Sequence, residues 1–283
     1  MAKVKILSDS TCDLPAEIIE KYDIGIIPLY INLGGKVYKD NKIDVTPSII
    51  YDFVEKTGEL PGTIGATVED FKIEFEKWHN EGYEIVCHTI SSDMSCTYQN
   101  AVIASEGIDG VYVVDSRNLC TGVGLCVMNS AELAMQGKSA AEIAESTAEF
   151  TKKVNTSFVI NTLDYLKKGG RCSSVAALGA NLLKIKPQIV VDGGTMRVGK
   201  KFRGPLSKVR MEYVDTLFKD KDDIDTRRVV LAHTYGVSRE QLDALRDRIN
   251  QYISFDEIIE TEAGATITSH SGPETIGIMF IQK

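Results

Sequence analysis

A mainly apolar run that passes directly into hydroxyl side chains constrains this chain more than any other stretch. Residues 83–90 (YEIVCHTI) predict a buried strand, and a helix is expected to begin near Ser95. Between them, four hydroxyl side chains fall within seven residues, at Ser91, Ser92, Ser95 and Thr97. A strand that leads into a helix brings free backbone N–H groups and the positive end of the helix dipole to one place.

These hydroxyls have two interpretations. A Ser or Thr before a helix is usually a cap for its first N–H groups. One hydroxyl suffices for a cap, and four of them beside a helix N-terminus also suit a bound carboxylate or phosphate. The stretch is therefore a candidate anion site, with Ser92 and Ser95 as candidate ligands.

The first half of the chain repeats the order of strand and helix. Strands are expected at 4–7, 24–31, 83–90 and 111–115, and a hairpin turn at Gly34-Gly35. Helices are expected after Asp13, Thr46, Thr67, Ser95, Thr121 and Ser139; Asp13 is the expected N-cap of the first, and Thr67 with Asp70 and Ser139 with Glu142 resemble capping boxes. This alternation predicts an N-terminal α/β domain over residues 1–156, a Rossmann-like parallel sheet with helices on both faces.

The second half has a different pattern. Short helices are expected at 162–168 and 175–183, and longer ones around Val209–Leu217 and Leu242–Ile249. Strands are expected near 188–191, 195–198, 228–233, 256–262, 264–269 and 275–282, with a hairpin turn at 192–194. Strands joined by hairpins predict a C-terminal α+β domain over residues 157–283.

Two further residues are candidates for binding. Thr63 lies between two glycines in the expected loop 60–67, where a turn residue is the ordinary interpretation and contact with a ligand the alternative. His270 is expected at the end of a strand, among hydroxyls and before Gly272-Pro273. It is either an exposed turn residue or one oriented toward an anion.

Composition excludes several classes of protein. The net charge of −8 and the absence of a Lys/Arg block argue against a nucleic-acid binder, and 200–203 (KKFR) is expected to be a solvated basic cluster. No apolar run has membrane-spanning length, and the N-terminus enters a strand without a signal peptide. The six cysteines contain no CxxC pair, which predicts reduced thiols in a cytoplasmic protein. The four histidines have no paired spacing, which predicts that the protein has no metal site. Gly122 and Gly124 lack the third glycine of a dinucleotide loop.

Five stretches together resemble the DegV family, the fatty-acid-binding proteins that include the FakB subunit of bacterial fatty acid kinase. Residues 8–15 resemble the family pattern D-S-x-x-D-L-P, and residues 90–101 resemble I-S-S-x-x-S-G-T-Y-x-x-A. Residues 163–171 resemble L-x-Y-L-x-K-G-G-R, residues 183–187 resemble L-N-I-K-P, and residues 270–273 resemble H-T-G-P-G. The resemblance covers essentially the whole chain.

This chain departs from the family patterns at several positions. The family's T-S-Q-P loop is similar to 63–66 (TIGA), which keeps only the threonine. Cys96 and Glu274 stand where the patterns have glycine, and Lys184 where they have asparagine. The loss of a hydroxyl at Ile64 and the negative charge of Glu274 are expected to alter the head-group site.

The resemblance implies a two-domain fold with one long-chain fatty acid buried between the domains. Thr63, Ser92 and Ser95 would hold its carboxylate, and Arg171 and His270 would face the phosphate or head group. No cofactor is implied. A separate ATP-using kinase subunit would phosphorylate the carboxylate, with Arg203 as the candidate docking residue, so this chain would be a carrier and not an enzyme.

Two other functions stay open. Ser95 and His270 could form a serine esterase, although the G-x-S-x-G pattern is missing and no acidic partner can be assigned. The departures at residues 64 and 274 also allow a binder of another small anionic metabolite. A long apolar tunnel would indicate a lipid, and a short wet cleft would indicate a metabolite.

Overall fold

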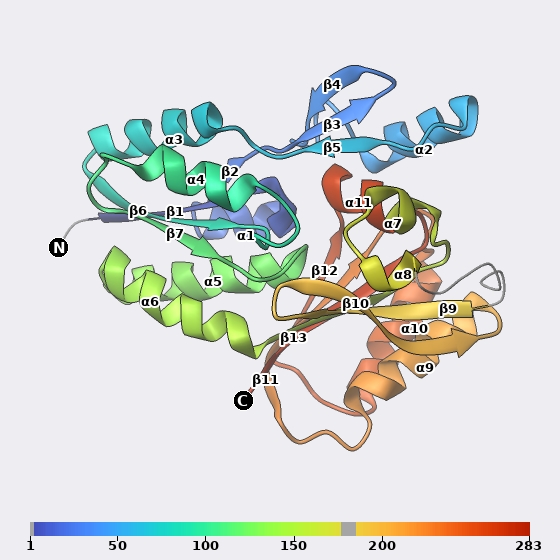
Figure 1. Cartoon of the computed structure of the whole chain (residues 1–283). Helices are drawn as coiled ribbons and strands as arrows, with labels where there is room; N and C mark the ends of the chain where they lie inside the picture. Colours follow the sequence, from blue (N-terminus) through green and yellow to red (C-terminus); the bar gives the residue numbers. More distant parts are fainter. Residues whose placement is uncertain (1–2, 177–184) are drawn as a thin grey trace.

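The computed structural model describes residues 3–176 and 185–283 (Figure 1). In this part of the chain there are a four-stranded, a six-stranded and a three-stranded sheet. The four-stranded sheet has the order β2-β1-β6-β7 and is parallel throughout. Its strands are β1 (Lys3–Asp9), β2 (Gly25–Ile27), β6 (Tyr83–Thr89) and β7 (Val111–Asp115).

Helices cover both faces of the parallel sheet, which confirms the predicted α/β architecture. α3 (Val68–Asn80) and α4 (Thr97–Ser105) lie on one face, and α5 (Thr121–Met135) and α6 (Ala140–Phe150) on the other (Figure 1). The capping boxes expected at Thr67 and Ser139 are both present. The N-cap predicted at Asp13 is wrong: α1 (Ala16–Lys21) follows Pro15, and the Asp13 side chain accepts a hydrogen bond from Gly264 N instead.

The three-stranded sheet lies beside the parallel one and consists of β3 (Tyr30–Leu33), β4 (Lys36–Lys39) and β5 (Gly62–Ile64). The strand expected over 24–31 is divided between β2 and β3 at Pro28, whose nitrogen has no hydrogen to donate to a ladder. β5 lies within the loop expected over 60–67 and pairs with β3, with Thr63 opposite Ile31. α2 (Pro47–Thr57) begins after Thr46, as expected.

The six-stranded sheet has the order β10-β9-β8-β13-β11-β12 and is antiparallel except for β11 and β12. α9 (Leu206–Phe218) and α10 (Arg239–Asn250) pack on one face. The remaining helices are short: α7 (Asp164–Gly169), α8 (Ser173–Ala176) and α11 (Ala265–Ser271). Of the helix expected over 175–183, residues 177–183 lie outside the described residues. The strands are β8 (Val154–Val159), β9 (Ile185–Asp192), β10 (Thr195–Arg203), β11 (Ile224–His233), β12 (Glu257–Glu262) and β13 (Ile276–Gln282).

α5 joins the two large sheets, because one apolar core contains buried apolar residues of α5 together with residues of the four-stranded and the six-stranded sheet. Close packing explains its glycines. A Cβ at Gly124 would lie 2.7 Å from the carbonyl oxygen of Cys12, and one at Gly122 would collide with Thr156 of β8. The sheets change between α6 and β8, close to residue 156, but the division into domains 1–156 and 157–283 stays a prediction.

The strand predicted at 264–269 is wrong, since this segment is the helix α11. The β-branched residues Thr266, Ile267 and Thr268 favour a strand, but distant residues stabilise the helix. Asp13 accepts a hydrogen bond from Gly264 N (2.8 Å), and Asp40 accepts from Ala265 N and Thr266 N (3.1 Å each). Both aspartates are buried. Two carboxylates from the first forty residues therefore cap a helix near the end of the chain.

Replacing Asp40 with alanine tests this cap. The N–H groups of Ala265 and Thr266 and the hydroxyl of Ser10 would lose their acceptor. We expect Asp40→Ala to lower the free energy of unfolding by about 2–4 kcal/mol, measured by urea denaturation. Asp44→Ala, at an exposed aspartate nearby, should change it by less than about 0.5 kcal/mol. Equal effects of the two substitutions would contradict the proposed cap.

Candidate functional site

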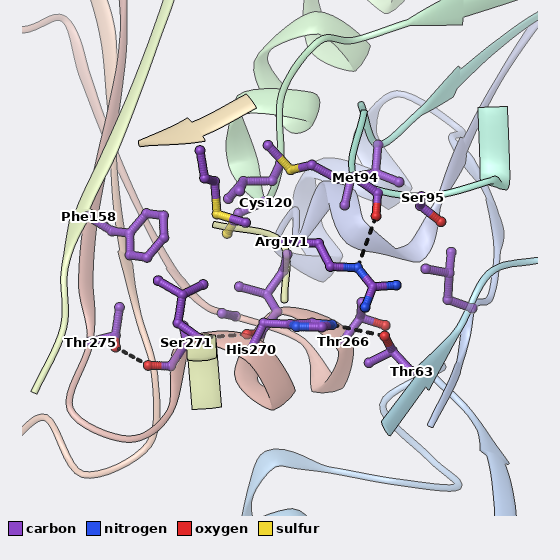
Figure 2. Close-up of a pocket in the computed structure, with 18 of the residues that line it drawn as sticks. Thr63, Met94, Ser95, Cys120, Phe158, Arg171, Thr266, His270, Ser271 and Thr275 are labelled. Atoms are coloured by element: carbon purple, nitrogen blue, oxygen red, sulfur yellow. Dashed lines mark hydrogen bonds between the residues drawn. The ribbon is translucent and has the colours of Figure 1, made fainter. Parts of the chain in front are cut away.

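A cavity of about 310 Å³ lies where the three sheets meet. Its size is at the lower end of the roughly 300–1,000 Å³ typical of ligand pockets. Much of its wall is apolar and comes from β8, β10 and β13 and from the loops that follow β6 and β7. Figure 2 shows Met94 and Phe158 among these residues. Apolar residues that line it include Ile90, Met94, Leu119, Phe158, Met196 and Met279.

Five polar side chains lie together on one side of this cavity, whereas Ser271 and Thr275, whose hydroxyls are bonded to backbone carbonyl oxygens, line it nearer Phe158 (Figure 2). The five are Thr63 of β5, Ser95 of the loop before α4, Arg171 after α7, and Thr266 and His270 of α11 (Figure 2). The Thr63 Oγ1 atom lies 2.9 Å from Nε2 of His270. An apolar cavity with hydrogen-bonding groups at one side can hold an elongated amphiphile with a polar head.

Thr63 is positioned by the pairing of β5 with β3 and by the glycine that follows Ile64. A Cβ at Gly65 would lie 2.8 Å from Oγ1 of Thr97 and 3.2 Å from Oγ of Ser95. The missing side chain lets β5 lie against the start of α4, which brings Thr63 and Ser95 to the same cavity. Ser95 Oγ lies 2.7 Å from Thr97 Oγ1 and accepts a hydrogen bond from Thr97 N (3.3 Å).

His270 is in the last turn of α11, so its predicted place at a strand end is wrong. Gly169 packs directly against its ring, since a Cβ there would collide with Nδ1. Burial, and secondarily the charge of Arg171, lowers the pKa of His270 to about 4, so the imidazole is neutral near pH 7.

A neutral imidazole carries one N–H, and the surroundings of His270 decide which nitrogen holds it. Nδ1 is buried without a hydrogen-bond partner in the described residues. A proton on Nδ1 would therefore be an unsatisfied donor, whereas one on Nε2 is donated to Thr63 Oγ1. With this tautomer, Thr63 accepts from His270 and its own O–H is free to donate into the cavity.

Arg171 supplies the positive charge of the site. Its Nε donates to the carbonyl oxygen of Met94 (3.3 Å) and its Nη1 to that of Gly169 (2.6 Å). Within residues 3–176 and 185–283, no carboxylate forms an ion pair with it, and the side chain is exposed. Two carbonyl oxygens thus hold a guanidinium whose charge is available to an anion.

The structure does not bring Ser92 to the cavity. Its Oγ donates to Asp115 (2.6 Å) and accepts from Arg117 (3.1 Å). Ser91 donates to the carbonyl oxygen of Gly194 (2.7 Å) in the β9–β10 turn. Ser91 therefore joins the end of β6 to the six-stranded sheet, and Ser92 joins it to the end of β7. Of the four hydroxyls after β6, only that of Ser95 belongs to a cavity-lining residue.

Of the residues that depart from the family patterns, some line the cavity and others lie outside it. Glu274 does not line the cavity: Asn161 Nδ2 donates to its carboxylate (2.7 Å), and its φ of 58° explains why glycine suits this position. The expectation that it charges the head-group site is therefore wrong. Cys96 is an exposed residue at the cavity wall, and Ile64 lines the cavity while 44% exposed. Lys184 lies outside the described residues.

Arg203 lies at the exposed end of β10, outside the cavity lining. Thr266, in contrast, lines the cavity although sequence reasoning did not single it out. Had the segment been recognised as a helix, its spacing of four residues from His270 would have placed both side chains on one face.

Among the described residues, no group of three or more His, Cys, Asp or Glu side chains could hold a metal ion. No described helix is long and apolar enough to span a membrane.

The pKa of His270 gives a testable pH dependence. As the pH falls from the ordinary value of 6.5 toward 4, the unfolded chain takes up a proton at this histidine before the folded protein does. The free energy of unfolding should therefore decrease over this window, and His270→Gln should remove that part of the decrease. The ring signals of His270 in NMR spectra, assigned by comparison with His270→Gln, should not titrate above pH 5. Titration near pH 6.5 would contradict the neutral imidazole.

Comparison with known proteins agrees with the fold and identifies the family. The family model described as "Uncharacterised protein, DegV family" matches residues 3–283. A protein of Thermotoga maritima named fatty acid-binding protein is 34% identical over 282 residues, covering 97% of this chain and 96% of its own.

Solved structures have the same fold over their whole length. A DegV lipid-binding protein from Thermotoga maritima is 31% identical, with a TM-score of 0.86 over 99% of this chain and 98% of its own. A stearic acid-binding protein from Eubacterium ventriosum is 26% identical, with a TM-score of 0.82 over 100% of this chain and 99% of its own. The chain belongs to the DegV family.

Proposed function

We propose that this protein binds one long-chain fatty acid, with its chain in the apolar part of the cavity and its carboxylate among Thr63, Ser95 and Arg171. The observation that carries the proposal is the apolar cavity with hydroxyls and one cation on one side. The relatives named for fatty acid and stearic acid binding support the same ligand class.

The energetics of the cavity suit such a ligand. Each CH₂ group transferred from water to an apolar wall contributes roughly 0.8 kcal/mol, so a long chain gains most of its affinity here. The carboxylate would be costly to bury without hydrogen bonds. The O–H of Thr63, set free by the bond from His270, and the guanidinium of Arg171 can supply them.

The geometry argues against a serine esterase. Ser95 Oγ is hydrogen-bonded to Thr97, and the neutral His270 is hydrogen-bonded to Thr63, so no described base activates the serine. The mainly apolar wall likewise disfavours a small polar metabolite, which would leave that surface without contacts. A carrier function is therefore favoured over both alternatives.

We further propose that the bound carboxylate is presented to a separate, ATP-using fatty acid kinase. The exposed Arg171 lies where an added phosphate would need a cation. Arg203 is exposed, without an ion-pair partner in the part of the chain that the structure describes, and would dock an acidic surface of the kinase. The carrier itself would then supply no catalytic group.

The binding role of Thr63 is tested with a valine substitution. We expect Thr63→Val to weaken stearate binding roughly tenfold, because a hydrogen bond to the charged carboxylate is lost. Delipidated protein would be titrated in a displacement assay with a fluorescent fatty acid. Thr195→Val, at an exposed strand threonine outside the cavity, should bind as the parent does. Failure of the parent protein to bind would overturn the proposed function.

The docking role of Arg203 is tested separately from lipid binding. Arg203→Glu should keep the affinity for stearate and lower acyl-phosphate formation by the kinase at least tenfold, because the charge at the contact is reversed. Arg197→Glu on the same strand, exposed and paired with Asp192, is the matched control and should leave the rate near that of the parent. Equal rates for Arg203→Glu and the parent would remove Arg203 from the docking surface.

A further inference from the structure

Four residues of α11 carry hydroxyl groups, and three of them are hydrogen-bonded within the helix region. Thr268 donates to the carbonyl oxygen of Ala263 (3.3 Å), Ser269 to that of Ala265 (2.8 Å) and Ser271 to that of Ile267 (2.8 Å). The fourth, Thr266, has no partner for its Oγ1 in the described residues. Its side chain is 4% exposed. A buried hydroxyl without a partner is an unusual and costly feature of a folded protein.

The place of Thr266 suggests what this hydroxyl binds. It lines the cavity one turn before His270, on the polar side that includes Thr63 (Figure 2). Its backbone N–H is already bonded to Asp40, as is that of Ala265, so neither of these two amides is left for a ligand. The side-chain hydroxyl of Thr266 remains available.

We propose that the Thr266 hydroxyl donates a hydrogen bond to the carboxylate of the bound fatty acid, as a further hydroxyl ligand beside Thr63 and Ser95. This inference rests on the proposed function. Ile64, beside Thr63 on β5, has no hydroxyl to offer, so Thr266 would supply from α11 a donor that β5 lacks. The carboxylate would satisfy a group that the protein itself leaves unpaired.

Two substitutions separate the hydroxyl from the shape of the side chain. Thr266→Val keeps the shape and removes the hydroxyl, and Thr266→Ser keeps the hydroxyl. With delipidated protein and stearate, Thr266→Val should bind roughly tenfold more weakly than the parent, and Thr266→Ser within about twofold of it. Without ligand, Thr266→Val should melt no lower than the parent, since it removes an unpaired buried group.

The combination of weaker binding and retained stability distinguishes a ligand contact from a structural role. Methyl stearate has an uncharged ester carbonyl, which is a weaker acceptor, so Thr266→Val should weaken its binding less than that of stearate. If the parent binds stearate and Thr266→Val binds it as tightly, the inference is overturned while the proposed function stands. If the parent binds no stearate, the proposed function itself fails.

Discussion

The site depends on how the protein satisfies the buried start of α11. A helix N-terminus inside a protein needs acceptors for its free N–H groups. Asp13 and Asp40 supply them from the loops that follow β1 and β4, and burial with the nearby charge of Asp40 raises the pKa of Asp13 to about 7. These bonds fix α11 against the first half of the chain and thereby place Thr266 and His270 in the cavity wall.

The polar side of the cavity offers hydroxyl groups more than positive charge. His270 is neutral and acts through Thr63, whose hydroxyl it orients. Gly169 makes this possible, because any side chain there would displace the imidazole ring. Arg171 is the exposed cation of the group. A carboxylate held by neutral donors, with one cation toward solvent, would be bound firmly yet remain reachable by a partner.

Local signals predicted much of the fold, and contacts distant in sequence account for what was missed. The capping boxes at Thr67 and Ser139 and the strands of the parallel sheet depend on neighbouring residues, and they were predictable. α11 was missed because its β-branched sequence favours a strand, and its caps come from residues more than 200 positions away. Thr63 and Ser95 were predicted and line the cavity, whereas Ser92 is bound by Asp115 and Thr266 was hidden by the wrong assignment. Which hydroxyls face a ligand depends on tertiary partners that a sequence pattern does not reveal.

Native mass spectrometry of the purified protein, followed by extraction and identification of any released lipid, tests directly whether the cavity holds a fatty acid. If it does, the protein has a mass excess of one long-chain fatty acid per chain, lost on delipidation and restored by added stearate. A protein that is unliganded as purified and takes up no added fatty acid would contradict the proposed function, and the cavity would then have to serve a different ligand.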